Sequence, residues 1–144
     1  MKGYYAPSID MIRAICGSME KWLHLSTSSA KKIFGNYSGM CALCYYEKSM
    51  RERALKDRIF TNYCELCPIG MVSGDGCDAT PWVEIERLNN SLENFDYENG
   101  ASIKDYTLAE YEFLVDLFFY TVECYREGKR IDRDEFEKYR LTSE

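Results

Sequence analysis

Apolar side chains recur along the N-terminal part of the chain at intervals of three and four residues. This spacing places them on one face of a helix and predicts a helix from about Ser8 to His24. Gly17 weakens that helix without forbidding it. The serine-rich break STSS then offers N-caps for a short helical turn, AKKIFG, that stops at Gly35. The predicted apolar face comprises Ile9, Ile12, Cys16, Met19 and Leu23.

The clearest periodic segment lies in the C-terminal half of the chain, where apolar residues repeat at three and four over residues 108–125. We expect it to form the core helix and to end near Gly128. Its stripe consists of Leu108, Tyr111, Val115, Phe118, Val122 and Tyr125, widened by Leu114, Leu117 and Phe119.

Three further helices are predicted from composition and capping signals. Residues 42–59 are rich in strong helix formers and contain neither glycine nor proline. Thr80 and Pro81 suit the N-cap and first position of a helix over WVEIERLNNSLENF, and Asp132 suits the start of a last short helix. From Thr61 to Pro81 the turn signals PIG, SGDG and TP indicate irregular backbone instead.

No alternating segment is long enough to require a strand. The predicted fold is therefore all-α: a compact bundle of five or six helices with an irregular, zinc-knuckle-like metal-binding loop inserted. Length and composition fit one globular domain over residues 1–144, because 46% of the side chains are hydrophobic and only three of 144 are proline. No stretch approaches the roughly 20 apolar residues of a membrane span, so we expect no membrane contact and a cytoplasmic location.

The charge is unevenly distributed. The net charge is −6, yet residues 1–60 carry more basic than acidic side chains. Residues 84–116 form an acidic, aromatic segment in which Arg87 and Lys104 are the only basic residues. This balance disfavours nucleic-acid binding by the whole surface, whereas an acidic face suits a basic protein partner.

Five of the seven cysteines lie within residues 41–82, the segment predicted to bind a metal. Cys41 and Cys44 form one Cys-x-x-Cys pair and Cys64 and Cys67 form another, at a spacing typical of zinc sites. Cys77 either replaces one of these four ligands or lies beside the site. Zinc is the expected ion, and a [4Fe–4S] cluster, which also takes four thiolates, is the alternative.

Other roles suit the clustered cysteines less well. Buried free thiols explain a cluster at turns poorly, and neither pair opens a helix after a strand pattern as a thioredoxin-like site requires. Cys16 and Cys124 lie on helical apolar faces, where we expect core thiols. His24, the only histidine, suits a capping or surface role better than metal ligation.

The succession SMEKW, CALC, CELCPIG and GCDATPW resembles a group of small, uncharacterised proteins encoded mainly in bacteriophage genomes. The resemblance covers about residues 17–82. It implies phage origin, hence the cytoplasm of an infected bacterium, and it aligns Cys41, Cys44, Cys64, Cys67 and Cys77 as one set without assigning an activity. The chain differs from this group in two features: the helix between its two cysteine pairs is long and basic, and its C-terminal half has no counterpart in the resemblance.

The sequence contains no Gly-rich phosphate-binding loop, no Ser-His-Asp catalytic triad motif and no helical His-Glu-x-x-His zinc motif. We therefore expect that the protein is not an enzyme. The preferred function is a metal-binding protein that acts through protein–protein contact, with inhibition of a host defence protein as one form of it. Binding to nucleic acid through a basic helix over residues 45–58 and iron–sulfur redox or sensing chemistry are the alternatives. The candidate partner-binding residues are Glu84, Glu86, Glu93, Asp96, Tyr97 and Glu98, and those for nucleic acid are Lys48, Arg51, Lys56 and Arg58.

Overall fold

The computed structural model describes residues 6–37, 41–54, 66–73, 80–90 and 100–142. All regular secondary structure in these ranges is helical, which confirms the all-α prediction for this part of the chain. The helices are α2 (Ile9–Ser26), α3 (Ala30–Asn36), α4 (Ala42–Ala54), α5 (Pro68–Ser73), α6 (Trp82–Asn90), α7 (Gly100–Glu127) and α8 (Arg133–Thr142).

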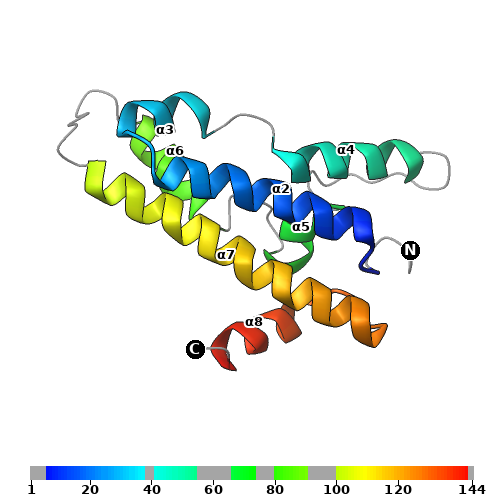
Figure 1. Ribbon diagram of the computed structural model, residues 1–144. Coiled ribbons are helices and arrows are strands. Elements are labelled where there is room, and N and C mark those ends of the chain that lie inside the picture. The colour runs from blue at the N-terminus through cyan, green and yellow to red at the C-terminus, as the bar shows by residue number, and fades with distance from the viewer. Residues whose placement is uncertain (1–5, 38–40, 55–65, 74–79, 91–99, 143–144) are drawn as a thin grey trace.

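Helices α2 and α7 lie side by side in opposite directions and form the centre of the fold (Figure 1). Helix α4 packs on α2. Helices α3 and α6 both cover the N-terminal half of α7, and α8 folds back under the C-terminal half of α7. The core between them is apolar and includes Ile15 of α2, Ile85 of α6 and Leu117 of α7, all fully buried. None of the described helices has both the length and the apolar character needed to cross a membrane.

Local capping signals placed several helix ends correctly. The Ser8 hydroxyl oxygen accepts a hydrogen bond from the Met11 N–H and caps α2, as the Asp132 carboxylate does for α8 through the Glu135 N–H. Gly128 ends α7 with a φ of 67°, and the Lys129 N–H then bonds the Cys124 carbonyl at 2.9 Å.

Helix α5 corrects the expectation of irregular backbone over residues 61–81. Pro68 stands at its first position, where a missing N–H costs nothing, and the Met71 N–H bonds the Cys67 carbonyl at 3.0 Å. Four of its six residues are buried, so the packing of Ile69, Met71 and Val72 stabilises a helix that is too short to be stable alone.

The buried face of α2 lies beside the one predicted. Ile9 and Leu23, both assigned to the apolar face, are 45% and 47% exposed. The side chains that are buried instead are Met11, Ala14, Ile15, Ser18, Trp22 and Leu25. The buried face includes a serine, so it is less uniformly apolar than the face beside it. A prediction from apolar periodicity alone therefore selects the neighbouring face.

Helix α7 shows the same difference more strongly. Leu108, Phe119 and Tyr125 are 43%, 54% and 46% exposed, so these members of the predicted stripe face outward, whereas Tyr111 and Phe118 pack against the core. Leu114 and Leu117, which the prediction included only at its margin, are fully buried. The buried face also carries three polar residues, Thr107, Glu110 and Thr121.

Candidate metal centre

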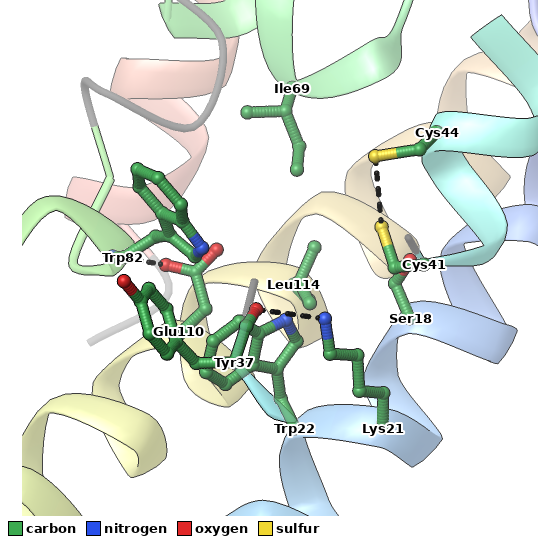
Figure 2. A pocket seen from close by; sticks show the side chains of 10 residues that line it. All are labelled: Ser18, Lys21, Trp22, Tyr37, Cys41, Cys44, Ile69, Trp82, Glu110 and Leu114. Carbon is green, nitrogen blue, oxygen red and sulfur yellow. Dashed lines mark hydrogen bonds between the residues drawn. The ribbon is translucent and has the colours of Figure 1, made fainter. Parts of the chain in front are cut away.

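The first cysteine pair is held at the start of α4. Cys41 immediately precedes the helix, and its carbonyl accepts hydrogen bonds from the N–H groups of Cys44 at 3.0 Å and Tyr45 at 3.2 Å. This turn brings the two Sγ atoms to 3.7 Å from each other (Figure 2). Two thiolates bound at about 2.3 Å to one tetrahedral Zn²⁺ lie about 3.8 Å apart. The pair thus already has the separation that a tetrahedral ion requires, and it is far from the roughly 2.0 Å of a disulfide.

The surroundings of Cys41 favour its thiolate. Hydrogen bonding with the Cys44 side chain lowers the pKa of Cys41 most, and burial opposes this effect. The Ser18 hydroxyl, the Cys44 N–H and the positive charge of Lys21 lower it further, to about 5. A thiolate is the form that binds a metal or attacks an electrophile, so Cys41 is prepared for ligation at neutral pH.

Helix α2 forms one wall of this site. The Ser18 side chain is buried, and its oxygen accepts the N–H of Leu43 at 3.3 Å, which ties α2 to the first turn of α4. Lys21 reaches across to donate to the Tyr37 carbonyl at 3.0 Å, and its ammonium lies 5.1 Å from the ring centre of Trp22. Three residues of the SMEKW stretch therefore line the same pocket as Cys41 and Cys44.

Glu110 of α7 faces the site from the opposite wall (Figure 2). Its side chain is almost fully buried, and its Oε2 accepts the Trp82 N–H at the start of α6 at 3.0 Å. Burial raises its pKa to about 7, with a smaller contribution from Cys41, while hydrogen bonds from Thr80 and Trp82 act in the other direction. Glu110 thus joins α7 to α6 and changes charge near neutral pH.

The space enclosed by these walls is small, about 100 Å³. Ile69 of α5 and Leu114 of α7 complete the lining with apolar surface. Binding sites for organic ligands are typically about 300–1,000 Å³. This cavity therefore suits an ion or a few water molecules better than an organic substrate.

The remaining predicted ligands do not complete a site within the described residues. Cys67 is buried at the start of α5, and Cys64 and Cys77 lie outside the described residues. In the described ranges no three histidine, cysteine, aspartate or glutamate side chains are grouped closely enough to hold a metal ion. The structure thus brings together Cys41 and Cys44, and the full set of five cysteines stays a prediction.

The expectation of a core thiol is confirmed for Cys124 but not for Cys16. Cys124 is buried in α7, and burial raises its pKa, as expected of a core thiol. Cys16 is half-buried on α2, outside the core cluster, and burial again raises its pKa. His24 is exposed in the last turn of α2.

The two predicted surfaces are only partly described. On α4, Lys48 is exposed, whereas Arg51 bonds the buried Glu47 at 2.6 Å, so its charge is partly neutralised. On α6, Glu84 pairs with Arg87 and Glu86 accepts the Tyr37 hydroxyl. Further candidates lie outside the described residues, namely Lys56, Arg58, Glu93, Asp96, Tyr97 and Glu98.

Comparison with known proteins adds no relative: no protein-family model, curated protein or solved structure matches the chain. A function is therefore argued from the residues at the site. The sequence pattern identifies the cysteine pair of this site but not Ser18, Lys21 or Glu110. Glu110 lies on the buried side of α7 between Thr107 and Leu114, and no sequence pattern marks that side as the buried one.

Replacing Ser18 by alanine removes a hydroxyl that bonds both Cys41 and the Leu43 N–H. We expect the free energy of unfolding to fall by about 1 kcal/mol, as for loss of a helix cap. Zinc affinity should fall by about tenfold, since groups that hydrogen-bond a ligand tune the metal. Denaturant titration and competition with a chromophoric chelator measure the two effects. Ser26→Ala, at an exposed backbone contact on the same helix, is the control and should change neither.

Proposed function

We propose that the protein is a non-enzymatic, helical metal-binding module that uses a structural zinc ion to present a surface to a partner protein. The observation that carries the zinc assignment is the 3.7 Å separation of Cys41 and Cys44, which fits a tetrahedral ion. The lowered pKa of Cys41 supports it further, because a ligating cysteine must be deprotonated. Cys64, Cys67 and Cys77 are the proposed source of the remaining ligands.

A metal at this position would have a structural role. Cys41 and Cys44 lie at the start of α4, and α5 begins directly after Cys67. An ion held by thiolates from both pairs would fix α4 and α5 relative to α2, and its binding free energy would add to the stability of the fold. The turn signals SGDG and TP follow α5 in the sequence, where a bound ion would act as an organiser of the chain.

The partner assignment rests on the resemblance to phage-encoded proteins and on the acidic balance of the C-terminal half. We propose a phage-type protein that acts in the bacterial cytoplasm by contacting a host protein, and inhibition of a defence component is one such action. An affinity pull-down from a bacterial host extract, followed by direct binding measurements with the purified candidate, tests this assignment. Capture of nucleic acid alone would favour the basic-helix alternative instead.

Elemental analysis of the protein purified without oxygen or added metal tests the zinc assignment. We expect about one zinc per chain, no visible absorbance and loss of most of the zinc in Cys41→Ser and Cys44→Ser. Cys124→Ser, at a cysteine buried in α7, is the control and should retain it. A visible charge-transfer band together with bound iron would show that the site holds an iron–sulfur cluster instead of zinc.

Absence of both metals, together with no zinc binding in chelator competition, would contradict the proposal.

Where zinc is bound, Cys77→Ser identifies the ligand set. If it loses zinc as Cys41→Ser does, Cys77 is a ligand and one member of the two pairs is not. If it keeps zinc, the two pairs suffice.

A further inference from the structure

The outer face of α7 carries a continuous apolar stripe. Leu108 and Phe119 are 43% and 54% exposed, and the half-buried Val115 and Val122 lie on the same side of the helix. These positions differ by seven, four and three residues, so they follow one line over about 21 Å. The Phe119 ring is braced by an edge contact with Phe118, at 5.3 Å between ring centres.

This stripe differs from the isolated apolar residues that any protein surface shows. Single exposed leucines need no explanation, but a contiguous row along one helix marks a surface that another molecule covers. Helix α7 already buries its opposite side with Leu114 and Leu117, which pack in the core. It therefore has two apolar faces, of which the described part of the chain uses one.

Acidic residues border the stripe along one edge. Asp105, Glu112 and Glu123 are exposed, and their positions place them on a single side of the row. The neighbouring Asp116 is neutralised by Arg140 of α8, at 3.0 Å. The described face thus combines an apolar centre with a negatively charged rim, while Lys104 and Arg126 stand near its two ends.

The charges decide which occupant fits. A second copy packed antiparallel about a two-fold axis would place the same edge of both helices together and set Asp105 of one copy against Glu123 of the other. A nucleic acid would be repelled by the same rim, and the chain already carries a net charge of −6. A helix with an apolar face and basic flanks meets both features of the surface.

We propose that the outer face of α7, from Leu108 to Val122, is the docking surface for a basic amphipathic helix of the partner protein. The inference rests on the proposed function, because it identifies where that partner binds and what chemistry recognises it. The apolar row supplies the contact area, and the acidic edge sets the orientation and excludes acidic partners.

A synthetic 18-residue peptide tests the surface, with leucines along one helical face and lysines on its flanks, labelled for fluorescence anisotropy. We expect saturable binding to the full-length protein at physiological salt. A peptide of the same composition in scrambled order keeps the charge and loses the apolar face, so it should bind at least about tenfold more weakly. Equal binding of both peptides would show that net charge alone drives the interaction, and it would overturn the proposal.

Variants of the protein locate the contact. Phe119→Ser should weaken binding at least about tenfold, and Glu112→Lys should weaken it by a similar factor. Tyr45→Ser is the matched control, because Tyr45 is a 61% exposed aromatic residue on α4. Equal effects at Phe119 and Tyr45, or no binding of the amphipathic peptide at all, would overturn the assignment. So would a concentration-dependent dimer in sedimentation that Phe119→Ser abolishes, because a second copy would then cover the face.

The zinc content of the same samples separates this proposal from the metal assignment. Phe119 lies on the outside of α7, away from the cysteine pocket, so Phe119→Ser should retain zinc as the unmodified protein does. Normal zinc content without peptide binding overturns the docking surface alone. Peptide binding by a protein that holds no zinc upholds the surface and contradicts the metal assignment.

Discussion

Replacing Gly17 by alanine is expected to lower the free energy of unfolding by about 2 kcal/mol, although alanine is the better helix former by about 1 kcal/mol. The reason is the crossing of α2 and α4. A Cβ placed on Gly17 would lie 2.6 Å from the Cβ of Ala42. The Ala42 Cβ is fixed to its backbone and cannot swing aside, so the two helices would have to move apart.

Three further variants make this prediction specific. Gly35 also lies in a helix, α3, but a Cβ there would meet no atom within 4 Å, so Gly35→Ala should leave stability unchanged or raise it. Ala42→Gly removes the opposing methyl group, and the Gly17→Ala/Ala42→Gly pair should recover most of the loss. Denaturant titration of the four variants and the unmodified protein measures these differences. A Gly17→Ala protein as stable as Gly35→Ala would show that α4 does not approach α2 so closely.

The crossing also concerns the metal centre. Ala42 stands between Cys41 and Cys44, so the contact with Gly17 positions the turn that holds both thiolates. We therefore expect Gly17→Ala to weaken zinc retention as well, and the double variant to restore it. Gly17 lowers the helix propensity of α2, but only glycine lets α4 approach this closely. Helix propensity alone does not predict such a contact.

The positions of the helices were predictable because their ends are marked locally. A serine at position 8, a glycine at 128 and an aspartate at 132 each cap a helix through contacts within a few residues. Such signals are present in the sequence and need no knowledge of the rest of the fold. The all-α class followed from them and from the absence of strand patterns.

The buried faces were not predictable by the same reasoning. The buried side of α7 carries Thr107, Glu110 and Thr121. The two threonine hydroxyls bond carbonyls of α7 itself, and Glu110 accepts the Trp82 N–H of α6. The outer side is more apolar than a solvated surface requires. Apolar periodicity therefore indicated the exposed stripe, because burial depends on which neighbours cover a helix as well as on its hydrophobicity.

The candidate site was predictable in its cysteines and not in its surroundings. Pairs at two-residue spacing identify thiolate ligands directly, since the chemistry needs both sulfurs at one ion. Ser18 and Glu110 lie 23 and 69 residues from Cys41 and enter the pocket only because α2 and α7 pack beside α4 and α6. Neither position carries a local pattern that distinguishes it from other serines and glutamates.

Replacing Glu110 by glutamine is expected to change how stability depends on pH. In the folded protein the pKa of Glu110 is raised from 4.5 to about 7, chiefly by burial. The folded state therefore binds this proton more tightly than the unfolded state does. Its contribution to stability is fully present below about pH 4.5 and is lost as the pH rises to about 7. Over that range the loss amounts to about 3 kcal/mol, from 1.36 kcal/mol per pKa unit.

Glutamine stays neutral, and its side-chain oxygen can still accept the Trp82 N–H. Glu110→Gln should therefore match the unmodified protein near pH 5 and exceed its stability by about 2–3 kcal/mol at pH 8. Denaturant titrations at pH 5, 6, 7 and 8 on both proteins measure this difference. The zinc content measured at each pH separates any release of metal from the titration of Glu110.

Glu112→Gln provides the matched control, because Glu112 is exposed on the same helix only two residues away. Its pH profile should parallel that of the unmodified protein. Parallel profiles for Glu110→Gln as well would mean that Glu110 titrates alike in the folded and unfolded chain, which its burial against Trp82 and Thr80 argues against. A gain at high pH in Glu110→Gln alone would show that this carboxylate is kept at a cost in stability, as groups beside a functional site are.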